Sequence, residues 1–454
     1  MARTLRPSRS VDMEFGAMTS HAAQAADPSR PLPSGCPLHH GPLSFGTADM
    51  TGEDPEALFT RLRERGPVID IRLEGDVPAW LVIGYNEADE VLRRTDRYTR
   101  DPRTWNVPRE GRLPEGWPLE PHLTFRPDML FASGAEHARL RGSLNRSLGA
   151  IGSYRLHRSI KDAADRLIDA FQEAGEAELV SQYAAPLPMF VLTRLFGFPR
   201  QDEALLQSGI RTLLEAGEDA LDANRTINQI IAAHIARRRA EPATDIVSAL
   251  VQDGAALTDA EIHATIWLTI NAALGATTSW LSNTIGSLAR SAARQHDLHS
   301  GYADVQSVMD ETLWGLTPVQ QIIGYIATGD RELGGARVRD GDLLVVSLAG
   351  ANLDHQRLGG NRHRASYTDR DGANLSWGNG PHDCPAPARA LASAIVRDGV
   401  DRLWTRLPDL HLTDPDEPTT WGPSPIVRTP DKLPGSFDAV KARALTQTLT
   451  TGGR

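Results

Sequence analysis

The chain of 454 residues has only two cysteines, Cys36 and Cys384, and few aromatic side chains, which make up 6% of the sequence. Two cysteines cannot form the set of disulfides that holds many small secreted proteins together, so we expect a reducing, cytoplasmic environment. The sequence also lacks an uninterrupted run of about 18 apolar residues, and we therefore expect no membrane-spanning helix.

Basic residues are not in excess. The formal net charge is −10, from 58 acidic and 48 basic side chains, which argues against nucleic-acid binding as the main function. Hydrophobic residues make up 40% of the chain, which is enough for a large core. Because there is no internal repeat and no evident interdomain linker, the sequence predicts one folded domain.

The two ends differ from the middle in composition. Residues 1–41 are rich in Ser, Pro, Ala and Arg and lack the apolar stretch of a signal peptide. We expect a disordered leader over 1–41, the folded domain over 42–440 and a flexible tail over 441–454. Cys36 lies beside His39 and His40 in this leader, but a zinc site needs a fuller set of ligands, so no metal site is predicted there.

The pattern of apolar residues predicts a mainly α-helical protein with small β-sheets. We expect helices over 54–65, over 86–92 with Asn86 as the cap, in several pieces over 135–290, and over 385–407. Strands are expected over 68–73 and 79–83. Between these elements, residues 101–131 show little periodicity and are predicted to be a long loop region.

The most apolar helix is expected over 259–290. A helix of this length crosses a whole domain, and apolar residues on most of its sides indicate burial. After Gly334 the pattern changes to β, and we expect a hairpin in which 336–338 pairs with 343–348 across a turn at Asp340 and Gly341.

Cys384 follows the glycine-rich run 376–383 and directly precedes a predicted helix. Gly378 and Gly380 would allow a tight turn that approaches a flat ligand closely. Amide groups of the turn and the N-terminus of the helix would favour the ionised thiol. The arrangement indicates an axial thiolate ligand for a haem iron, and the alternative is a buried free cysteine in a glycine-rich loop.

From about residue 42 to residue 437 the chain resembles a soluble bacterial cytochrome P450. The family's cysteine loop has the form Phe-Gly-x-Gly-x-His-x-Cys-x-Gly, and here Trp377 takes the place of Phe and Ala386 that of the last Gly. The resemblance implies a single haem domain of the P450 fold, haem b as cofactor and Cys384 as the metal ligand. The cofactor-binding residues that it implies in this loop are Trp377, Gly378, His382, Cys384 and Ala386.

Two further segments carry the resemblance. His137 and Arg141 match the family's His-x-x-x-Arg, whose spacing places two cationic side chains on one helix face for the haem propionates. Taken alone, this pair would be an ordinary solvated helix face. Residues 273–278 resemble the family's oxygen-binding helix segment, which implies a cofactor contact at Gly275.

The same segment supplies the implied catalytic residues, Thr277 and Thr278. The Thr277 hydroxyl is implied to hydrogen-bond dioxygen and to help deliver protons for O–O cleavage. The alternative for Thr277 is a hydrogen bond back to a carbonyl of its own helix.

Three departures from the family's pattern bear on function. Trp314 replaces the arginine of Glu-x-x-Arg, so the usual network shrinks to a Glu311–Arg364 pair, as in an actinobacterial subgroup that has this tryptophan. Tyr325 stands where a propionate-binding arginine is usual, and a phenol carries no charge. Ala276 stands where an acid is usual, so protons must come through Thr277, Thr278, water or the substrate.

The resemblance implies a monooxygenase or oxidase of secondary metabolism that oxidises a small molecule or peptide with O2. No flavin or nicotinamide domain is evident, so electrons are expected from ferredoxin and ferredoxin reductase, docked on a basic patch formed by Arg139, Arg146, Arg389 and Arg397. Ala276 motivates an alternative, oxidative aryl cross-linking of an aromatic peptide. A catalytically weakened haem-binding sensor or interaction protein and an H2O2-driven peroxygenase are further alternatives.

Substrate contacts are expected from residues 105–130, 181–214 and 319–323. The first segment and its flank are rich in polar and aromatic side chains, which would favour a polar or carboxylate-bearing substrate, or would form an exposed polar loop. These residues are Arg103, Trp105, Arg109, Arg112, Trp117, His122 and Arg126.

Overall fold

A computed structural model describes residues 41–46, 54–215, 218–302, 304–354 and 374–440. The predicted leader, apart from residue 41, and the predicted tail lie outside the described residues. So do Cys36, its neighbouring histidines and Arg364. The domain boundaries at 42 and 440 remain predictions.

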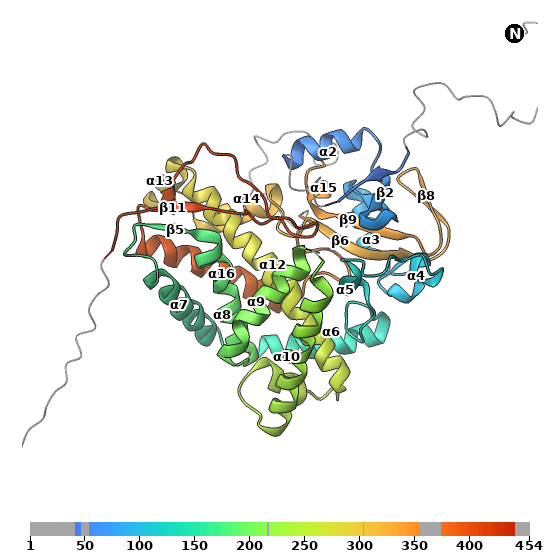
Figure 1. The fold of residues 1–454 in the computed structure, drawn as a ribbon, viewed down its shortest axis with the longest axis horizontal. Coiled ribbons are helices and arrows are strands. Elements are labelled where there is room, and N and C mark those ends of the chain that lie inside the picture. Colours follow the sequence, from blue (N-terminus) through green and yellow to red (C-terminus); the bar gives the residue numbers. More distant parts are fainter. Residues whose placement is uncertain (1–40, 47–53, 216–217, 303, 355–373, 441–454) are drawn as a thin grey trace, which may run out of the picture. The chain divides into compact units, whose positions relative to one another are not determined.

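Helices predominate, as the sequence predicts (Figure 1). In the described ranges they are α2 (Pro55–Arg63), α3 (Tyr85–Arg93), α4 (Asn106–Arg109), α5 (Glu120–Leu123), α6 (Gly134–Gly149), α7 (Ser153–Asp169), α8 (Pro186–Phe196), α9 (Arg200–Glu215), α10 (Ala220–Ala240), α11 (Ile246–Val251), α12 (Asp259–Ala289), α13 (Ala292–Ser300), α14 (Val305–Gly315), α15 (Leu348–Asn352) and α16 (Ala386–Arg406). Short helical turns occur at Glu74–Asp76 and Pro102–Thr104, and a π-helical turn at Val180–Ala184.

The strands form three small sheets. They are β1 (Leu43–Ser44), β2 (Val68–Leu73), β3 (Val77–Val82), β4 (Tyr98–Thr99), β5 (Glu176–Glu178), β6 (Gln321–Ala327), β7 (Arg331–Leu333), β8 (Ala336–Val338), β9 (Leu343–Ser347), β10 (His411–Leu412) and β11 (Pro434–Ser436). The largest sheet has the order β1-β2-β3-β9-β6-β4. The strands expected over 68–73 and 79–83 are confirmed as β2 and β3, which pair antiparallel.

The predicted hairpin after Gly334 is wrong. β8 pairs with β7, and the turn between them contains Gly334 and Gly335, both with positive φ. β9 instead runs inside the large sheet, parallel to β3 and antiparallel to β6. All five residues of β9 are buried, which is the pattern of a central strand rather than of an exposed hairpin. Leu348, placed at the end of this strand, begins α15.

The cap predicted for α3 is also wrong. The helix begins at Tyr85, and its N-cap is Gly84, which has no side chain to offer. The backbone N–H of Tyr85 instead donates a 3.0 Å hydrogen bond to Asp354 Oδ2. The capping oxygen therefore comes from a residue that lies far away in sequence, which no local pattern around Asn86 could indicate.

The two helices that matter most for function match their predictions. α12 covers 31 residues and begins with a capping box in which Thr258 and Glu261 bond to each other's backbone N–H groups. Residues on every side of α12 are buried, as expected for a helix inside a large core. α16 begins after Pro385 and buries the predicted apolar face.

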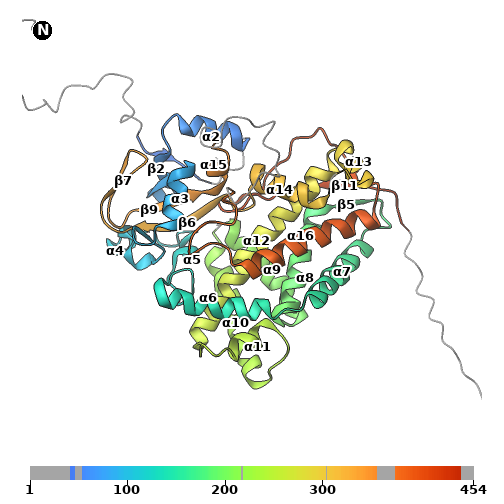
Figure 2. The ribbon, with the colours of Figure 1, turned by 180° about the vertical axis from the view of Figure 1, so that it is seen from behind.

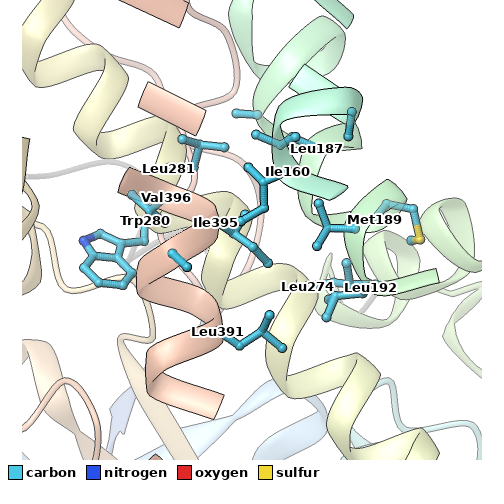
Figure 3. Close-up of a cluster of buried hydrophobic side chains, with 14 of the residues drawn as sticks. Ile160, Leu187, Met189, Leu192, Leu274, Trp280, Leu281, Leu391, Ile395 and Val396 are labelled. Carbon is cyan, nitrogen blue, oxygen red and sulfur yellow. The ribbon is translucent and has the colours of Figure 1, made fainter. Parts of the chain in front are cut away.

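α12 and α16 pack against each other in the helical part of the molecule (Figure 2). Figure 3 shows part of the core that joins them: Trp280 and Leu281 of α12 and Ile395 of α16, together with residues of α7 and α8. The pair is therefore held in a fixed relation by apolar packing on several sides.

The segment 101–131 contains only three short helical pieces and otherwise has no regular structure, as predicted. It is anchored by Trp105 and Trp117, which are buried and whose ring centres lie 5.6 Å apart. In the described part of the chain, no helix combines the length and the apolar character needed to cross a membrane.

Candidate active site

A largely apolar cavity of about 280 Å³ lies between α12 on one side and α6, the loop 376–385 and the start of α16 on the other. Segments distant in sequence contribute its walls. The predicted site residues that line it are His137, Arg141, Thr277, Trp377, Gly378, His382 and Cys384. The fold thus brings seven of the ten predicted site residues to one cavity.

The cysteine loop closes one wall of the cavity. The backbone N–H of Cys384 donates to the carbonyl of Trp377 at 2.8 Å, and that of Gly378 donates to the carbonyl of Leu375 at 2.8 Å. Gly378 and Gly380 have φ of 72° and 75°, conformations that favour glycine. A Cβ at Gly380 would lie 2.7 Å from the carbonyl oxygen of Leu92, so this glycine permits close packing against α3 rather than against a ligand.

The protein alone does not favour the ionised form of Cys384, contrary to the expectation from the loop amides and the helix N-terminus. Burial raises the pKa of the thiol to about 11, and Asp383 acts in the same direction, while Arg389 and Arg141 act against it. The Sγ atom lies 3.9 Å from the carbonyl oxygen of Pro385. A metal ion bound at the sulfur would reverse this effect, because metal coordination deprotonates a thiol.

Arg141 binds the cysteine loop. Its guanidinium donates to the carbonyl oxygens of Pro381 at 3.1 Å and Asp383 at 2.6 Å, and it also bonds the Asp383 carboxylate. Arg389 of α16 bonds the other oxygen of that carboxylate and the carbonyl of Cys384. Asp383, which the sequence did not single out, is thus held between two arginines and fixes the loop to α6 and α16.

The two predicted histidines meet in the cavity wall, where the ring centres of His137 and His382 lie 4.6 Å apart, edge to face. Burial lowers the pKa of His137, and the nearby charge of Arg141 adds to the effect. For His382, burial and then the charge of Arg100 lower the pKa to about 3. Both shifts favour the neutral form of the rings in the protein alone.

α12 presents two faces to two different cavities. Thr269, Ala273, Ala276 and Thr277 line the cavity that contains Cys384. Gly275 and Thr278, also predicted as site residues, line a second cavity of about 450 Å³, between α12, α9 and residues 422–431. The reason is the turn of about 100° between successive helical residues, which prevents neighbours such as Thr277 and Thr278 from facing the same way.

The remaining predicted contact, Ala386, is exposed at the first turn of α16 and is not part of the cavity lining. The ring of Trp377 meets that of Trp280 at a centre distance of 5.3 Å, edge to face. The aromatic residue at 377 thus joins the cysteine loop to α12.

The Thr277 hydroxyl differs from its neighbours on α12. Thr269 and Thr284 donate hydrogen bonds to the helix carbonyls of Thr265 and Trp280, at 2.7 and 2.8 Å. Thr277 is 3% exposed and lines the cavity, and within the described residues its hydroxyl makes no such bond. Its hydroxyl is therefore available to a molecule in the cavity, rather than being bonded to its own helix.

Comparison with known proteins agrees with this geometry, although no model of a known protein family matches the chain. The chain is 28% identical over 376 residues to a 2-hydroxy-5-methyl-1-naphthoate 7-hydroxylase of Streptomyces carzinostaticus, covering 80% of this chain and 90% of that protein. It is 27% identical over 391 residues to the cytochrome P450 monooxygenase PikC of Streptomyces venezuelae, covering 84% and 90%. Among solved structures, CYP154C4 from Streptomyces sp. ATCC 11861 superposes with a TM-score of 0.79 at 25% identity, over 88% of this chain and 98% of that one.

The chain is a cytochrome P450. Its fold is the P450 fold, its cofactor is haem b (iron protoporphyrin IX), and it is a monooxygenase, an oxidoreductase related to enzymes of secondary metabolism.

The residues present in the P450 fit this cofactor. The cavity is mostly apolar, as the flat macrocycle requires, and contains a cysteine in the wall opposite α12. At the polar end, His137 Nε2 is buried and has no hydrogen-bond partner among the described residues. A buried donor of this kind needs an acceptor, which a haem propionate would supply.

The Glu-x-x-Arg region of the P450 is reorganised. Glu311 forms an ion pair with Arg294 of α13, a residue that the sequence did not bring to attention. Whether Glu311 also meets Arg364 lies outside the described residues. Trp314 is partly exposed. Tyr325 is 2% exposed and belongs to the core beside the large sheet, where the guanidinium of Arg100 lies 4.6 Å from its ring centre.

The predicted basic docking patch of the P450 is largely neutralised by carboxylates. Arg139 pairs with Glu136 and Glu261, and Arg146 pairs with Asp253. The other two arginines of the patch, Arg389 and Arg397, pair with Asp383 and Asp398. Each predicted cation therefore has an acidic partner, which weakens the field that these four residues would present to an acidic protein.

The expected substrate segments contribute apolar side chains to the cavity. Met129 and Leu130 come from the first, Leu192 from the second, and Val319 and Ile322 from the third. None of the seven polar and aromatic residues singled out in and beside the first segment lines this cavity in the described structure. Arg126, for example, lies 3.7 Å from the ring centre of Trp267 and bonds the carbonyl of Pro121. The cavity itself thus favours an apolar substrate surface.

Proposed function

We propose that this P450 uses O2 and electrons from a ferredoxin and its reductase to oxidise a small molecule or peptide in secondary metabolism, with Cys384 as the axial ligand of the haem. The observation that carries the proposal is the placement of Cys384 and Thr277 in opposite walls of one largely apolar cavity. A haem held by a thiolate supplies the activation of dioxygen for transfer of an oxygen atom to a substrate.

Residues of the chain would hold the cysteine loop, bind the carboxylates of the cofactor and deliver protons. Arg141, Asp383 and Arg389 hold the cysteine loop in place through charged hydrogen bonds. His137 and His382, which line the cavity, would offer ring N–H groups to the carboxylates of the cofactor. The Thr277 hydroxyl would donate to dioxygen and pass protons from water, because Ala276 beside it has no proton to give.

Gly275, Thr278 and Ala386 contribute less directly in this proposal. Gly275 lets Leu214 of α9 approach α12, since a Cβ there would collide with the Leu214 side chain. Thr278 borders the second cavity, next to Leu214 and Ser424. We assign Gly275 and Thr278 to the shape of the substrate region and Ala386 to the start of α16.

Oxidative coupling of an aromatic substrate is a second candidate, supported by the acid-free α12 wall. In the described lining of the cavity the only carboxylate is Asp383, which lies in the opposite wall between two arginines. A phenolic or indolic substrate would bring its own proton. The product spectrum separates the two candidates: aromatic peptides that yield cross-linked dimers support coupling, and hydroxylated apolar compounds alone contradict it.

The absorption spectrum of the reduced, CO-bound protein tests the proposed ligand. We expect a strongly red-shifted Soret band in the wild type that is lost in Cys384→Ala, because only a thiolate shifts the band this way. Cys36→Ala, which removes the other cysteine of the chain, is the matched control and should keep the band. A band typical of histidine ligation in the wild type would overturn the proposal.

The electron donor needs a separate experiment. We expect a ferredoxin with its reductase to support NADPH consumption that rises when a substrate is added. Turnover with H2O2 alone at an equal rate would instead favour a peroxygenase, and substrate binding without turnover in either system would favour a sensor.

A further inference from the structure

Arg100 is a buried guanidinium that the sequence did not single out. It directly follows β4, is 5% exposed, and has two side-chain nitrogens, Nε and Nη1, with no hydrogen-bond partner. It forms no ion pair with any residue that the structure describes. Its contact with protein is the face of the Tyr325 ring, 4.6 Å from the guanidinium carbon. A buried cation in this state is costly unless something compensates its charge.

The nearest carboxylate does not supply that compensation. Asp128 is fully buried and attracts Arg100 at a distance, but its Oδ1 accepts the backbone N–H groups of Leu130 and Phe131. Its Oδ2 lies 3.4 Å from Arg126 Nε. Asp128 thus binds the loop backbone and lies close to another arginine. Burial lowers the pKa of Arg100, and this effect is larger than the opposite effect of the Asp128 charge.

Arg100 lies beside the polar end of the cavity. Its charge acts on His382, which lines the cavity and whose ring donates a hydrogen bond to the backbone of Met129, another lining residue. On its other side, β6 is irregular between Ile323 and Tyr325, and a Cβ at Gly324 would lie 3.8 Å from Arg100 Nη2. β6 also contributes Ile322 to the cavity. The guanidinium is therefore close to β6 and near enough to His382 for its charge to act on that ring.

The other cations near this end are already used. Arg141 is bonded to Asp383 and to two loop carbonyls. Two propionates bring two negative charges into a buried region, and a cation without a partner there would offset part of this charge. Position 325, where the family resemblance places a cationic residue, holds a tyrosine.

We propose that Arg100 binds a propionate of the haem and supplies, from the end of β4, the positive charge that β6 lacks at Tyr325. The inference depends on the proposed haem site. A guanidinium donates charged N–H hydrogen bonds to a carboxylate, and two nitrogens of Arg100 have no partner yet. Tyr325 then acts as the flat surface against which the guanidinium is stacked and oriented.

The test compares holoprotein variants in which the charge is removed, kept or moved. Arg100→Met removes the charge with little change in length, and we expect haem transfer to excess apomyoglobin to become roughly tenfold faster, as the loss of a charged hydrogen bond implies. We also expect a lower reduction potential, since a cation near the haem favours its reduced form. Arg103→Met is the matched control: Arg103 is exposed and paired with Asp101, and neither quantity should change.

A second variant keeps the proposal testable if Arg100→Met loses haem simply by disturbing the core. In Arg100→Met/Tyr325→Arg the charge is restored from β6, and we expect slow haem transfer and the reduction potential to recover. Recovery would support a charge requirement at this end of the cavity. Failure of the double variant to recover, or an Arg100→Met protein with unchanged transfer rate and potential, would overturn the proposal.

A failure of this inference can be told apart from a failure of the proposed function. If the wild type lacks the red-shifted CO band, the thiolate assignment fails, whatever Arg100 does. If the band is present and Arg100→Met behaves as wild type, only the propionate assignment fails.

Discussion

The two walls of the cavity differ sharply in charge. The wall formed by α6, the loop 376–385 and the start of α16, here called the cysteine wall, contains Arg141, Asp383 and Arg389 in one bonded network. The opposite wall, formed by α12, contributes apolar side chains and the hydroxyls of Thr269 and Thr277. Charge is thus concentrated on the side that would hold the cofactor.

This difference separates two requirements of the reaction. Holding a metal-bound cofactor needs a rigid loop, and charged hydrogen bonds provide that rigidity at low cost when both partners are satisfied. Proton delivery needs a mobile donor beside the substrate, and the α12 wall retains only the alcohol of Thr277 for it, since Thr269 is bonded to its own helix. We therefore expect single changes on the cysteine wall to affect cofactor binding, and single changes on the α12 wall to affect proton delivery.

Thr277→Ala would remove the free hydroxyl of the α12 wall and should have the largest effect. We expect the yield of product per NADPH to fall about tenfold or more, with H2O2 released instead, because general acid catalysis contributes roughly a hundredfold and water replaces part of it. The measurement is peroxide formed per NADPH consumed with a ligand found by spectral screening. An unchanged amount of peroxide per NADPH would mean that the Thr277 hydroxyl does not deliver protons.

Arg141→Met would break the cysteine wall. Three hydrogen bonds to the loop are lost and Asp383 keeps only Arg389, so we expect a loss of about 2 kcal/mol in holoprotein stability, and a lower haem content. Urea unfolding followed by the Soret band measures it. Arg146→Met is the control: Arg146 lies on the same helix, is exposed and bonds Asp253 instead of the loop, so the haem content should not change.

Ala276→Asp would place a carboxylate on the α12 wall and reduce the difference between the walls. Ala276 lines the cavity next to Thr277, so we expect severalfold less peroxide per NADPH than in the wild type. If the enzyme couples aryl groups, the ratio of coupled to hydroxylated product should be lower in this variant than in the wild type. A rise in peroxide release would show that the natural alanine serves proton delivery better than an acid does.

Thr278→Ala should have the smallest effect, because Thr278 lines the second cavity and not the one that contains Cys384. We expect peroxide per NADPH within about twofold of the wild type, since no general acid is removed. This variant is also the control for Thr277→Ala, since both remove one hydroxyl from adjacent positions of α12. An effect equal to that of Thr277→Ala would contradict the assignment of the two faces.

Much of the architecture could be predicted where the signal is local. The apolar pattern of α12 and its capping box, the end of α16 and the β2–β3 pair all depend on residues that are neighbours in sequence. The pairing of β9 and the cap of α3 could not be predicted in the same way. Both are decided by partners far away in the chain, β3 with β6 in one case and Asp354 in the other.

The candidate site shows the same division. The motif around Cys384 and the spacing of His137 and Arg141 identified residues that do meet in one cavity. Sequence reasoning treated residues 273–278 as one functional unit, whereas the helix turns Gly275 and Thr278 toward a different cavity. It missed Asp383 and Arg100, because an ordinary charged residue becomes significant only through its burial and its partners.

The sequence by itself determined the family, the cofactor and the elements that hold it, because a cysteine loop and an apolar helix are encoded by short, regular patterns. Only the tertiary structure decided the state of the charged groups. Pairing neutralised the four predicted docking arginines, and burial lowered the pKa of the two histidines and left Arg100 with two unpartnered nitrogens. The physical reason is that the energy of a charge depends on its distance from other charges and from water, which are properties of the folded chain.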